Sequence, residues 1–255
     1  MIPKLLHLCW LSGDAYPAKI ARCLKSWKTV LPDYEIVLWD TNRFPLSQSR
    51  WVKEAFESKK YAFAADYIRF YALYNYGGIY MDSDVEVLRS YDDLLDLPYF
   101  VGAEKAGTPE AAIIGAEKGC DWVKQCLDYY DNRPFIKADG SLDIRKLPEI
   151  MVEQIEKLKP VHVLSLDESK NIRELDFNKE VLVMSDEYFS PKVFDSREVE
   201  LTPYTYAIHH YQNSWFSPKA KAYYRFRTFL IRIFGYKFIY KAERTLMPWK
   251  FGKQK

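Results

Sequence analysis

Apolar positions along this chain recur with the two spacings of regular secondary structure. Residues 5–10 form an apolar run, residues 17–30 carry a helical pattern that begins at Pro17, and residues 34–39 alternate as a strand does. A strand, a helix and a strand in this order form a βαβ unit, which implies a parallel sheet. Further strands are predicted at 79–81, 85–88, 99–103, 111–116, 161–164 and 181–184, and further helices at 51–58, 62–76, 121–130 and 148–159. Segments 131–146 and 165–205 are predicted to be irregular, and the chain as a whole is predicted to be of the α/β class.

The stretch from residue 62 to residue 87 combines a helix and a strand with several charged side chains. Its apolar side chains are spaced i, i+4, i+7 and i+11, which predicts one buried stripe of an amphipathic helix: Phe63, Tyr67, Phe70 and Tyr74. Asp66 and Arg69 are three residues apart and therefore share another face of that helix. Gly77 and Gly78 follow, as expected where a helix ends in a left-handed conformation.

Two aspartates, Asp82 and Asp84, come directly after the apolar strand 79–81. Carboxylates at positions i and i+2, where a strand ends in a turn, can converge on one divalent cation, and oxygen ligands suit Mg²⁺ or Mn²⁺. In open α/β sheets, ligands bind outside the carboxyl ends of the strands. The pair alone has little weight, because the 18 aspartates of this chain give about one Asp-x-Asp by chance. Two solvated turn aspartates are the plain alternative.

Three segments resemble glycosyltransferase family 32, which includes bacterial capsule and lipopolysaccharide transferases and yeast mannosyltransferases and is related to the glucosyltransferase domains of clostridial toxins. AADYIRFYALYNYGGIYMDSDV (64–85) is similar to the sugar-binding region of this family, in which a helix with D-x-x-R precedes GG-x-Y-x-D-x-D. IPKLLHLCW (2–10) and HHYQNSW (209–215) are similar to its opening and closing motifs. The resemblance implies a GT-A type, Rossmann-like nucleotide-sugar-binding fold with a mostly parallel central sheet, as a catalytic domain over residues 1–216.

The resemblance also implies roles for individual residues. The expected catalytic residues, which hold the diphosphate, the donor sugar and the metal, are Asp66, Arg69, Asp82 and Asp84. The expected nucleotide contacts are Leu8, Trp10, Tyr80, Asp82, Ser83 and Trp215. The expected metal ligands are Asp82, Asp84 and His210. Only one of His209 and His210 can be a ligand, because adjacent strand residues face opposite ways; His210 is the one chosen, and His209 stays the alternative. A surface ion pair is the alternative for Asp66 and Arg69, and a core position is the alternative for Trp10 and Tyr80.

The function implied by the resemblance is transfer of a sugar from a nucleotide-sugar donor to a hydroxyl group of a glycan acceptor, with retention of anomeric configuration. Mn²⁺ or Mg²⁺ is the expected cofactor, a UDP-sugar is the favoured donor and a GDP-sugar the second candidate. Synthesis of a cell-surface polysaccharide on a lipid-linked glycan acceptor is the expected setting. Two other functions stay open: a phosphatase that uses aspartate as nucleophile, although Glu86 stands where that signature has Thr or Val, and a non-catalytic module that binds nucleotide sugars or glycans.

The distribution of charge predicts a second segment at the end of the chain, and the cysteines predict a cellular location. Residues 217–255 carry 11 Lys or Arg and one acidic residue, so this aromatic tail has a charge of +10 in a chain whose net charge is +2. We expect a helical tail that either contacts a membrane peripherally or packs as a hairpin on the catalytic domain, with a helix break at Gly235. No nucleic-acid recognition fold accompanies the tail. Four cysteines without a CxxC pair favour a reducing compartment, and we expect a cytoplasmic protein, placed at the inner face of the plasma membrane if the tail contacts the membrane.

Overall fold

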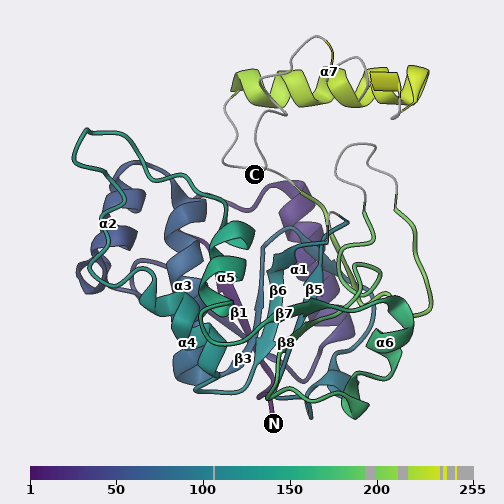
Figure 1. Cartoon of the computed structure of the whole chain (residues 1–255). Helices are drawn as coiled ribbons and strands as arrows, with labels where there is room; N and C mark the ends of the chain where they lie inside the picture. Colours follow the sequence, from purple (N-terminus) through teal and green to yellow (C-terminus); the bar gives the residue numbers. More distant parts are fainter. Residues whose placement is uncertain (106, 193–198, 212–217, 236–237, 240–244, 246–255) are drawn as a thin grey trace.

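The computed structural model describes residues 1–105, 107–192, 199–211, 218–235, 238–239 and 245 (Figure 1). Its strands are β1 (Leu5–Cys9), β2 (Glu35–Trp39), β3 (Gly78–Met81), β4 (Val85–Val87), β5 (Tyr99–Ala103), β6 (Pro109–Ala116), β7 (Val161–Val163), β8 (Val181–Val183) and β9 (Ala207–His209). Its α-helices are α1 (Ala18–Val30), α2 (Arg50–Glu57), α3 (Tyr61–Tyr76), α4 (Asp121–Asp128), α5 (Leu147–Ile155), α6 (Leu166–Lys170) and α7 (Pro218–Phe234).

The central sheet has the strand order β2-β1-β3-β6-β5. β1 is parallel to β2 and to β3, whereas β6 is antiparallel to both β3 and β5. A parallel bridge between Gly102 and Met184 continues the sheet to β8, which is parallel to β7. Among the described strands of this extended sheet, β6 is therefore the one that runs against the others. The predicted α/β class with a mostly parallel sheet is confirmed, but the reversal of β6 was not predicted.

Two layers of helices and loops cover the sheet (Figure 1). α2, α3, α4 and α5 contribute to the core on one face, with Trp51, Phe70 and Trp122 fully buried there. On the other face, Trp27 of α1 packs in a second core with β4 and with the aromatic residues that precede β9. The carboxyl ends of β1, β2 and β3 lie between these layers, and the loops that follow them are the positions where an open sheet of this kind binds ligands.

Helix α3 is buried more completely than the sequence predicted. Phe63 and Phe70 of the expected stripe are buried, but so are Ala64, Ile68 and Leu73 on other faces. The reason is that α3 lies between the sheet and its neighbours α2 and α4. A helix buried on most sides is apolar on most sides, so the expected single amphipathic stripe is wrong for this helix.

The two glycines after α3 allow β3 to enter the sheet. Gly77 and Gly78 have φ values of +67° and +107°, which confirms the predicted left-handed end of the helix. A Cβ on Gly78 would lie 2.7 Å from the carbonyl oxygen of Leu5 in the neighbouring strand. His7 secures the same turn: its Nε2 donates to the Gly77 carbonyl at 2.7 Å, and its Nδ1 accepts from Trp39. Burial lowers the pKa of His7 to about 4, so this histidine is neutral and structural.

Short elements in the second half of the chain depart from the prediction. Helix α6 lies inside the segment 165–205 that was predicted to be irregular, and Ser165 and Glu168 form a capping box at its start. Strand β9 pairs with β4 in antiparallel register.

None of the four cysteines forms a disulfide, and no helix of the described residues is long and apolar enough to cross a membrane.

Candidate active site

The two aspartates of the motif occupy the turn between β3 and β4. The backbone N–H of Asp82 donates to the carbonyl of Ala112 in β6 at 2.8 Å, which continues the sheet ladder one residue past β3. The Val85 N–H donates to the Asp82 carbonyl at 3.0 Å and closes the turn, so that Ser83 stands at its tip. Asp84 is buried with 8% of its surface exposed, and Asp82 is partly exposed. The strand end therefore presents one buried carboxylate and one that is partly exposed to solvent.

Arg69 of α3 organises the carboxylates around this turn. Its Nη2 donates to Asp66 at 3.3 Å and to Asp82 at 3.2 Å, and its Nη1 donates to the Ala111 carbonyl. Its guanidinium carbon lies 4.4 Å from the centre of the Tyr80 ring, and the Tyr80 hydroxyl donates to Asp82 at 3.0 Å. Only 4% of Arg69 is exposed, so the alternative of a surface ion pair is excluded. In this geometry Arg69 is a positioning residue that orients Asp82.

Burial changes the protonation equilibria of this group. Burial raises the pKa of Asp66 to about 7, although the Arg69 charge lowers it. Burial also raises the pKa of Asp82, and the charge of Asp84 adds to this effect while Arg69 opposes it. Carboxylates crowded in this way are stabilised in their ionised form by a further cation.

His209 supplies an imidazole to the same turn. The antiparallel pairing of β9 with β4 places His209 opposite Val85, next to Asp84. Its Nε2 lies 3.5 Å from Asp84 Oδ1, and its Nδ1 lies 3.4 Å from Glu110 Oε1. Burial alone would lower the pKa of His209, but the charges of Asp84 and Glu110 raise it well above its ordinary value.

Glu110 of β6 lies beside Nδ1 of His209, the ring nitrogen that does not face Asp84. It is 7% exposed, and its Oε2 accepts hydrogen bonds from the Tyr211 hydroxyl at 3.0 Å and from the Ser190 hydroxyl at 3.3 Å. His209, the Tyr211 hydroxyl and the backbone N–H of Ala112 offset the effect of burial and lower the pKa of Glu110. Sequence reasoning missed Glu110 and Tyr211. The signal that was present is a single acidic residue in the otherwise apolar strand PEAAIIGA.

The choice of His210 over His209 as a metal ligand is corrected by this geometry. His210 follows β9, and its Nε2 lies 2.7 Å from Glu86 Oε2. Lys192 donates to the carbonyl of His210 at 3.2 Å. The adjacent histidines do face opposite ways, as alternation requires, but the pairing register turns His209 toward the aspartates.

Asp82, Asp84 and His209 form a candidate metal centre. Each offers one ligand atom, and these atoms all lie within 4.8 Å of one another. Around an octahedral ion with bonds of about 2.1 Å, adjacent ligand atoms are about 3 Å apart. Two carboxylates suit Mn²⁺ or Mg²⁺, and the imidazole nitrogen favours a transition-metal ion such as Mn²⁺ over Mg²⁺. Glu110 fits the usual carboxylate partner of a ligating histidine. The residues present therefore fit a divalent cation.

The end of β1 contributes an aromatic pair. Trp10 is half-buried, its indole N–H donates to the Asp14 carbonyl at 2.8 Å, and its ring lies 4.8 Å from the Tyr16 ring. Trp10 is thus outside the buried core, and its contact with a nucleotide base remains a prediction. Trp215 lies outside the described residues.

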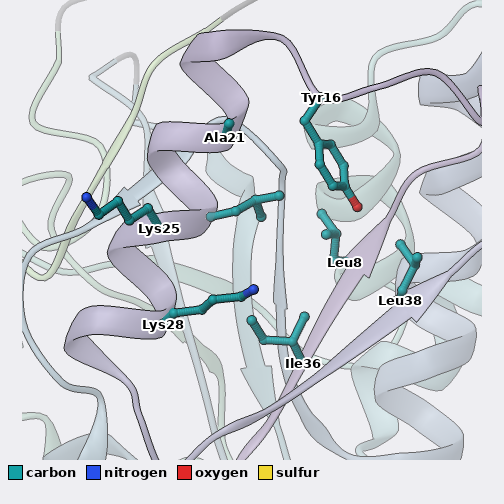
Figure 2. Close-up of a pocket in the computed structure, with 8 residues that line it drawn as sticks. Leu8, Tyr16, Ala21, Lys25, Lys28, Ile36 and Leu38 are labelled. Carbon is teal, nitrogen blue, oxygen red and sulfur yellow. The ribbon is translucent and has the colours of Figure 1, made fainter.

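Leu8 does not join the acidic cluster. Successive strand residues point to opposite faces, and it is the neighbouring Cys9 that feels the charges of Arg69, Asp82 and Asp66. Leu8 instead lines a groove of about 480 Å³ between α1 and the edge of the sheet (Figure 2). Ile36 and Leu38 of β2 form the same wall, and Lys25 and Lys28 of α1 stand opposite. The expected contact of the Leu8 side chain with the nucleotide is therefore not supported by this arrangement.

Comparison with known proteins matches the part of the chain that carries this site. Residues 17–101 match the family model described as "Glycosyltransferase sugar-binding region containing DXD motif". The chain carries a DXD-type sugar-binding region. This DXD region includes Asp66, Arg69, Tyr80, Asp82 and Asp84, whereas His209 and Glu110 come from later elements.

Relatives of this DXD region are named as transferases. The chain is 34% identical over 130 residues to "Inositol phosphoceramide mannosyltransferase 3" of Schizosaccharomyces pombe, a match that covers 49% of this chain and 36% of that protein. It is 24% identical over 185 residues to "Uncharacterized glycosyltransferase L373" of Acanthamoeba polyphaga mimivirus, covering 67% of this chain and 72% of that protein. Among solved structures, "PaToxG Glycosyltransferase" aligns with a TM-score of 0.45 and 18% identity over 62% of this chain and 71% of that chain. The chain spans between 27% and 36% of the length of the first three curated relatives it matches.

Replacement of the two histidines separates them as metal ligands. His209→Gln is expected to weaken Mn²⁺ binding at least about tenfold, because an amide oxygen replaces the imidazole nitrogen beside Asp84. His210→Gln serves as the matched control and is expected to leave Mn²⁺ affinity within error of the parent protein. Isothermal titration of the full chain with MnCl₂ measures both. Weaker binding by the His210 variant than by the His209 variant contradicts the assignment.

Proposed function

We propose that this chain is a metal-dependent glycosyltransferase that moves a sugar from a nucleoside diphosphate sugar to a hydroxyl group of an acceptor. The observation that carries the proposal is the convergence of Asp82, Asp84 and His209 within 4.8 Å, inside and next to a matched DXD region. The mostly parallel sheet supports it, since this turn lies at the carboxyl end of β3, as expected for the GT-A type.

The residues of the site suggest how the donor is held. Asp82, Asp84 and His209 would hold a divalent cation, which supplies positive charge against the diphosphate as the glycosidic bond breaks. Arg69 fixes the Asp82 carboxylate through Nη2, and the Glu110 carboxylate lies 3.4 Å from Nδ1 of the His209 ring, where its charge favours one orientation of that ring. Both contacts keep the ligand atoms in place before the donor arrives, which lowers the cost of reorganisation during reaction. Retention of configuration, with the acceptor attacking from the face of the departing diphosphate, remains part of the proposal.

The donor and acceptor are proposed by class. Curated relatives are named as mannosyltransferases that act on inositol phosphoceramide or as mannosyl phosphorylinositol ceramide synthases. Mannose is therefore the first candidate sugar, and a hydroxyl group carried on a membrane lipid or a lipid-linked glycan is the proposed acceptor. A UDP-sugar and a GDP-sugar both stay candidates for the donor, because no residue of the described site distinguishes the bases. A role in capsular or other cell-surface polysaccharide synthesis remains a proposal.

A thermal-shift and turnover screen tests this function. The full chain is heated with a panel of UDP- and GDP-sugars, with and without Mn²⁺, and the donors that stabilise it are then assayed for hydrolysis. A ligand that binds the folded state raises the melting temperature, and we expect the rise to need the metal and to be followed by slow release of the nucleoside diphosphate. Stabilisation without turnover on any acceptor indicates a binding module, and release of phosphate from simple monoesters indicates the phosphatase alternative.

A further inference from the structure

Helix α7 has an unusual composition for a surface helix. It spans Pro218–Phe234, carries five Lys or Arg and contains no acidic residue. It ends at Gly235, whose φ of +80° confirms the helix break predicted there. A helix of 17 residues is roughly 25 Å long and is too polar to cross a bilayer. All charged side chains of this helix are therefore positive.

The apolar side of α7 faces outward. Phe226, Phe229 and Ile233 follow the spacing i, i+3 and i+7 of a single helical face, and they are 60%, 57% and 56% exposed. We name these three residues the apolar stripe. Ile231 on the opposite side is only 5% exposed. Ile231 and Ile233 therefore point in different directions, the first toward the protein and the second toward solvent.

Positive charge borders the apolar stripe. Arg225 and Arg232 are exposed and precede Phe226 and Ile233 by one residue each, which places them along one flank of the stripe. Phe234, the last residue of the helix, and Phe238 beyond it add exposed aromatic surface, with ring centroids 5.8 Å apart. Exposed apolar residues gathered in one patch indicate a surface that binds another protein or a membrane. The arginines at its border favour a partner that carries negative charge.

We propose that the apolar stripe of α7 docks on the interface of an anionic lipid bilayer, with the helix lying parallel to the membrane surface. Aromatic rings at this depth and basic groups at the headgroup level are the features that hold interfacial helices. A second protein copy fits less well, because two such helices would bring Arg225 and Arg232 against their own counterparts. The proposal does not depend on the transferase function, since lipid binding is measured without a donor.

The placement of α7 gives this docking a consequence for the candidate active site. Figure 1 shows the N-terminus at one end of the molecule and α7 across the other end. β1 begins at Leu5, close to the N-terminus, so the parallel strands run toward α7, and the turn that bears Asp82 and Asp84 lies at their carboxyl ends. Docking through the apolar stripe therefore turns the candidate active site toward the bilayer. This last step rests on the proposed function, in which the acceptor hydroxyl is carried by a membrane lipid.

Vesicle sedimentation of the full chain tests the docking. At low salt we expect the protein to sediment with vesicles of phosphatidylcholine and phosphatidylglycerol and to stay in solution with phosphatidylcholine alone. Phe226→Ser combined with Phe229→Ser is expected to lower the partition coefficient at least tenfold, and Arg225→Gln combined with Arg232→Gln is expected to weaken the preference for anionic vesicles. Ile144→Ser combined with Leu158→Ser is the matched control, because these apolar side chains are 61% and 48% exposed on other parts of the molecule.

Two further measurements show whether each variant is still correctly folded. The melting temperature and Mn²⁺ affinity of each variant should equal those of the parent, because the substituted side chains are exposed. Failure of the parent protein to bind anionic vesicles, or unchanged binding by the double phenylalanine variant, overturns the proposal. Light scattering that shows a dimer dispersed by the same variant, without vesicle binding, assigns the apolar stripe to self-association instead. Loss of donor turnover with normal vesicle binding affects the proposed function and leaves the docking surface intact.

Discussion

Asp84→Asn is expected to lower metal-dependent donor hydrolysis at least about 100-fold, which corresponds to about 2.7 kcal/mol of activation free energy. The substitution keeps the shape of the side chain but removes the negative charge that faces His209 at 3.5 Å. Without it, the cluster has one carboxylate fewer to hold a divalent cation against the donor diphosphate. Single-turnover hydrolysis of the donor found in the thermal-shift screen, measured over a range of Mn²⁺ concentrations, provides the test.

Glu86→Gln is the matched control for this substitution. Glu86 lies two residues further along the chain, and its carboxylate contacts His210 rather than the candidate metal centre. The same change from acid to amide should therefore alter turnover by no more than about threefold. An Asp84→Asn protein that is folded and fully active at every Mn²⁺ concentration would falsify the proposed metal site.

Arg69→Ala is expected to lower the free energy of unfolding by about 3–5 kcal/mol, because it leaves Asp66 and Asp82 without their shared buried countercharge. Arg69→Lys keeps a charge but replaces the planar fork by one ammonium group, which cannot bond the Ala111 carbonyl and both carboxylates with the same geometry. We therefore expect the lysine variant to be more stable than the alanine variant but nearly as poor in donor turnover. Urea unfolding and donor hydrolysis, measured on both variants, separate the two effects.

Asp66→Asn in the Arg69→Ala background provides the control for that argument. Removal of the Asp66 charge should restore part of the lost stability, since the penalty comes from the unpaired buried carboxylate. The pKa of Asp66 in the folded protein is raised to about 7, so the folded state holds this proton more tightly than the unfolded state does. The contribution of Asp66 to the free energy of unfolding is therefore most favourable below the ordinary pKa of aspartate and is lost as the pH rises toward 7. A lysine variant with full turnover contradicts the positioning role of Arg69.

Much of the fold follows from local sequence signals. The predicted strands and most helices are present because alternation and helical spacing already separate buried from exposed positions. The segment after α3 follows for the same reason: Gly77 and Gly78 are suited to positive φ, and the apolar residues of β3 then place Asp82 and Asp84 at a strand end. These features depend on neighbours in the chain, and a sequence displays such neighbours directly.

The composition of the site was predicted only in part. Asp66, Arg69, Tyr80, Asp82 and Asp84 do lie together, because the helix and the strand that carry them are consecutive. The degree of burial of Arg69 was not predicted, because it depends on how α2 and α4 close around α3. The same packing explains why α3 is buried on most sides and is not the amphipathic helix that was expected.

By itself, the sequence determined the order of most strands and helices, the glycine turn and the position of the two aspartates, because each is set by residues close together along the chain. Only the tertiary structure decided that β6 runs against the other strands, that His209 rather than His210 joins the aspartates, and that Glu110 stands behind it. Those choices depend on the register between strands that are distant in sequence, and a shift of one residue in that register exchanges the two faces of a strand. The outward direction of the apolar stripe on α7 was decided in the same way, by which side of the helix the rest of the protein covers.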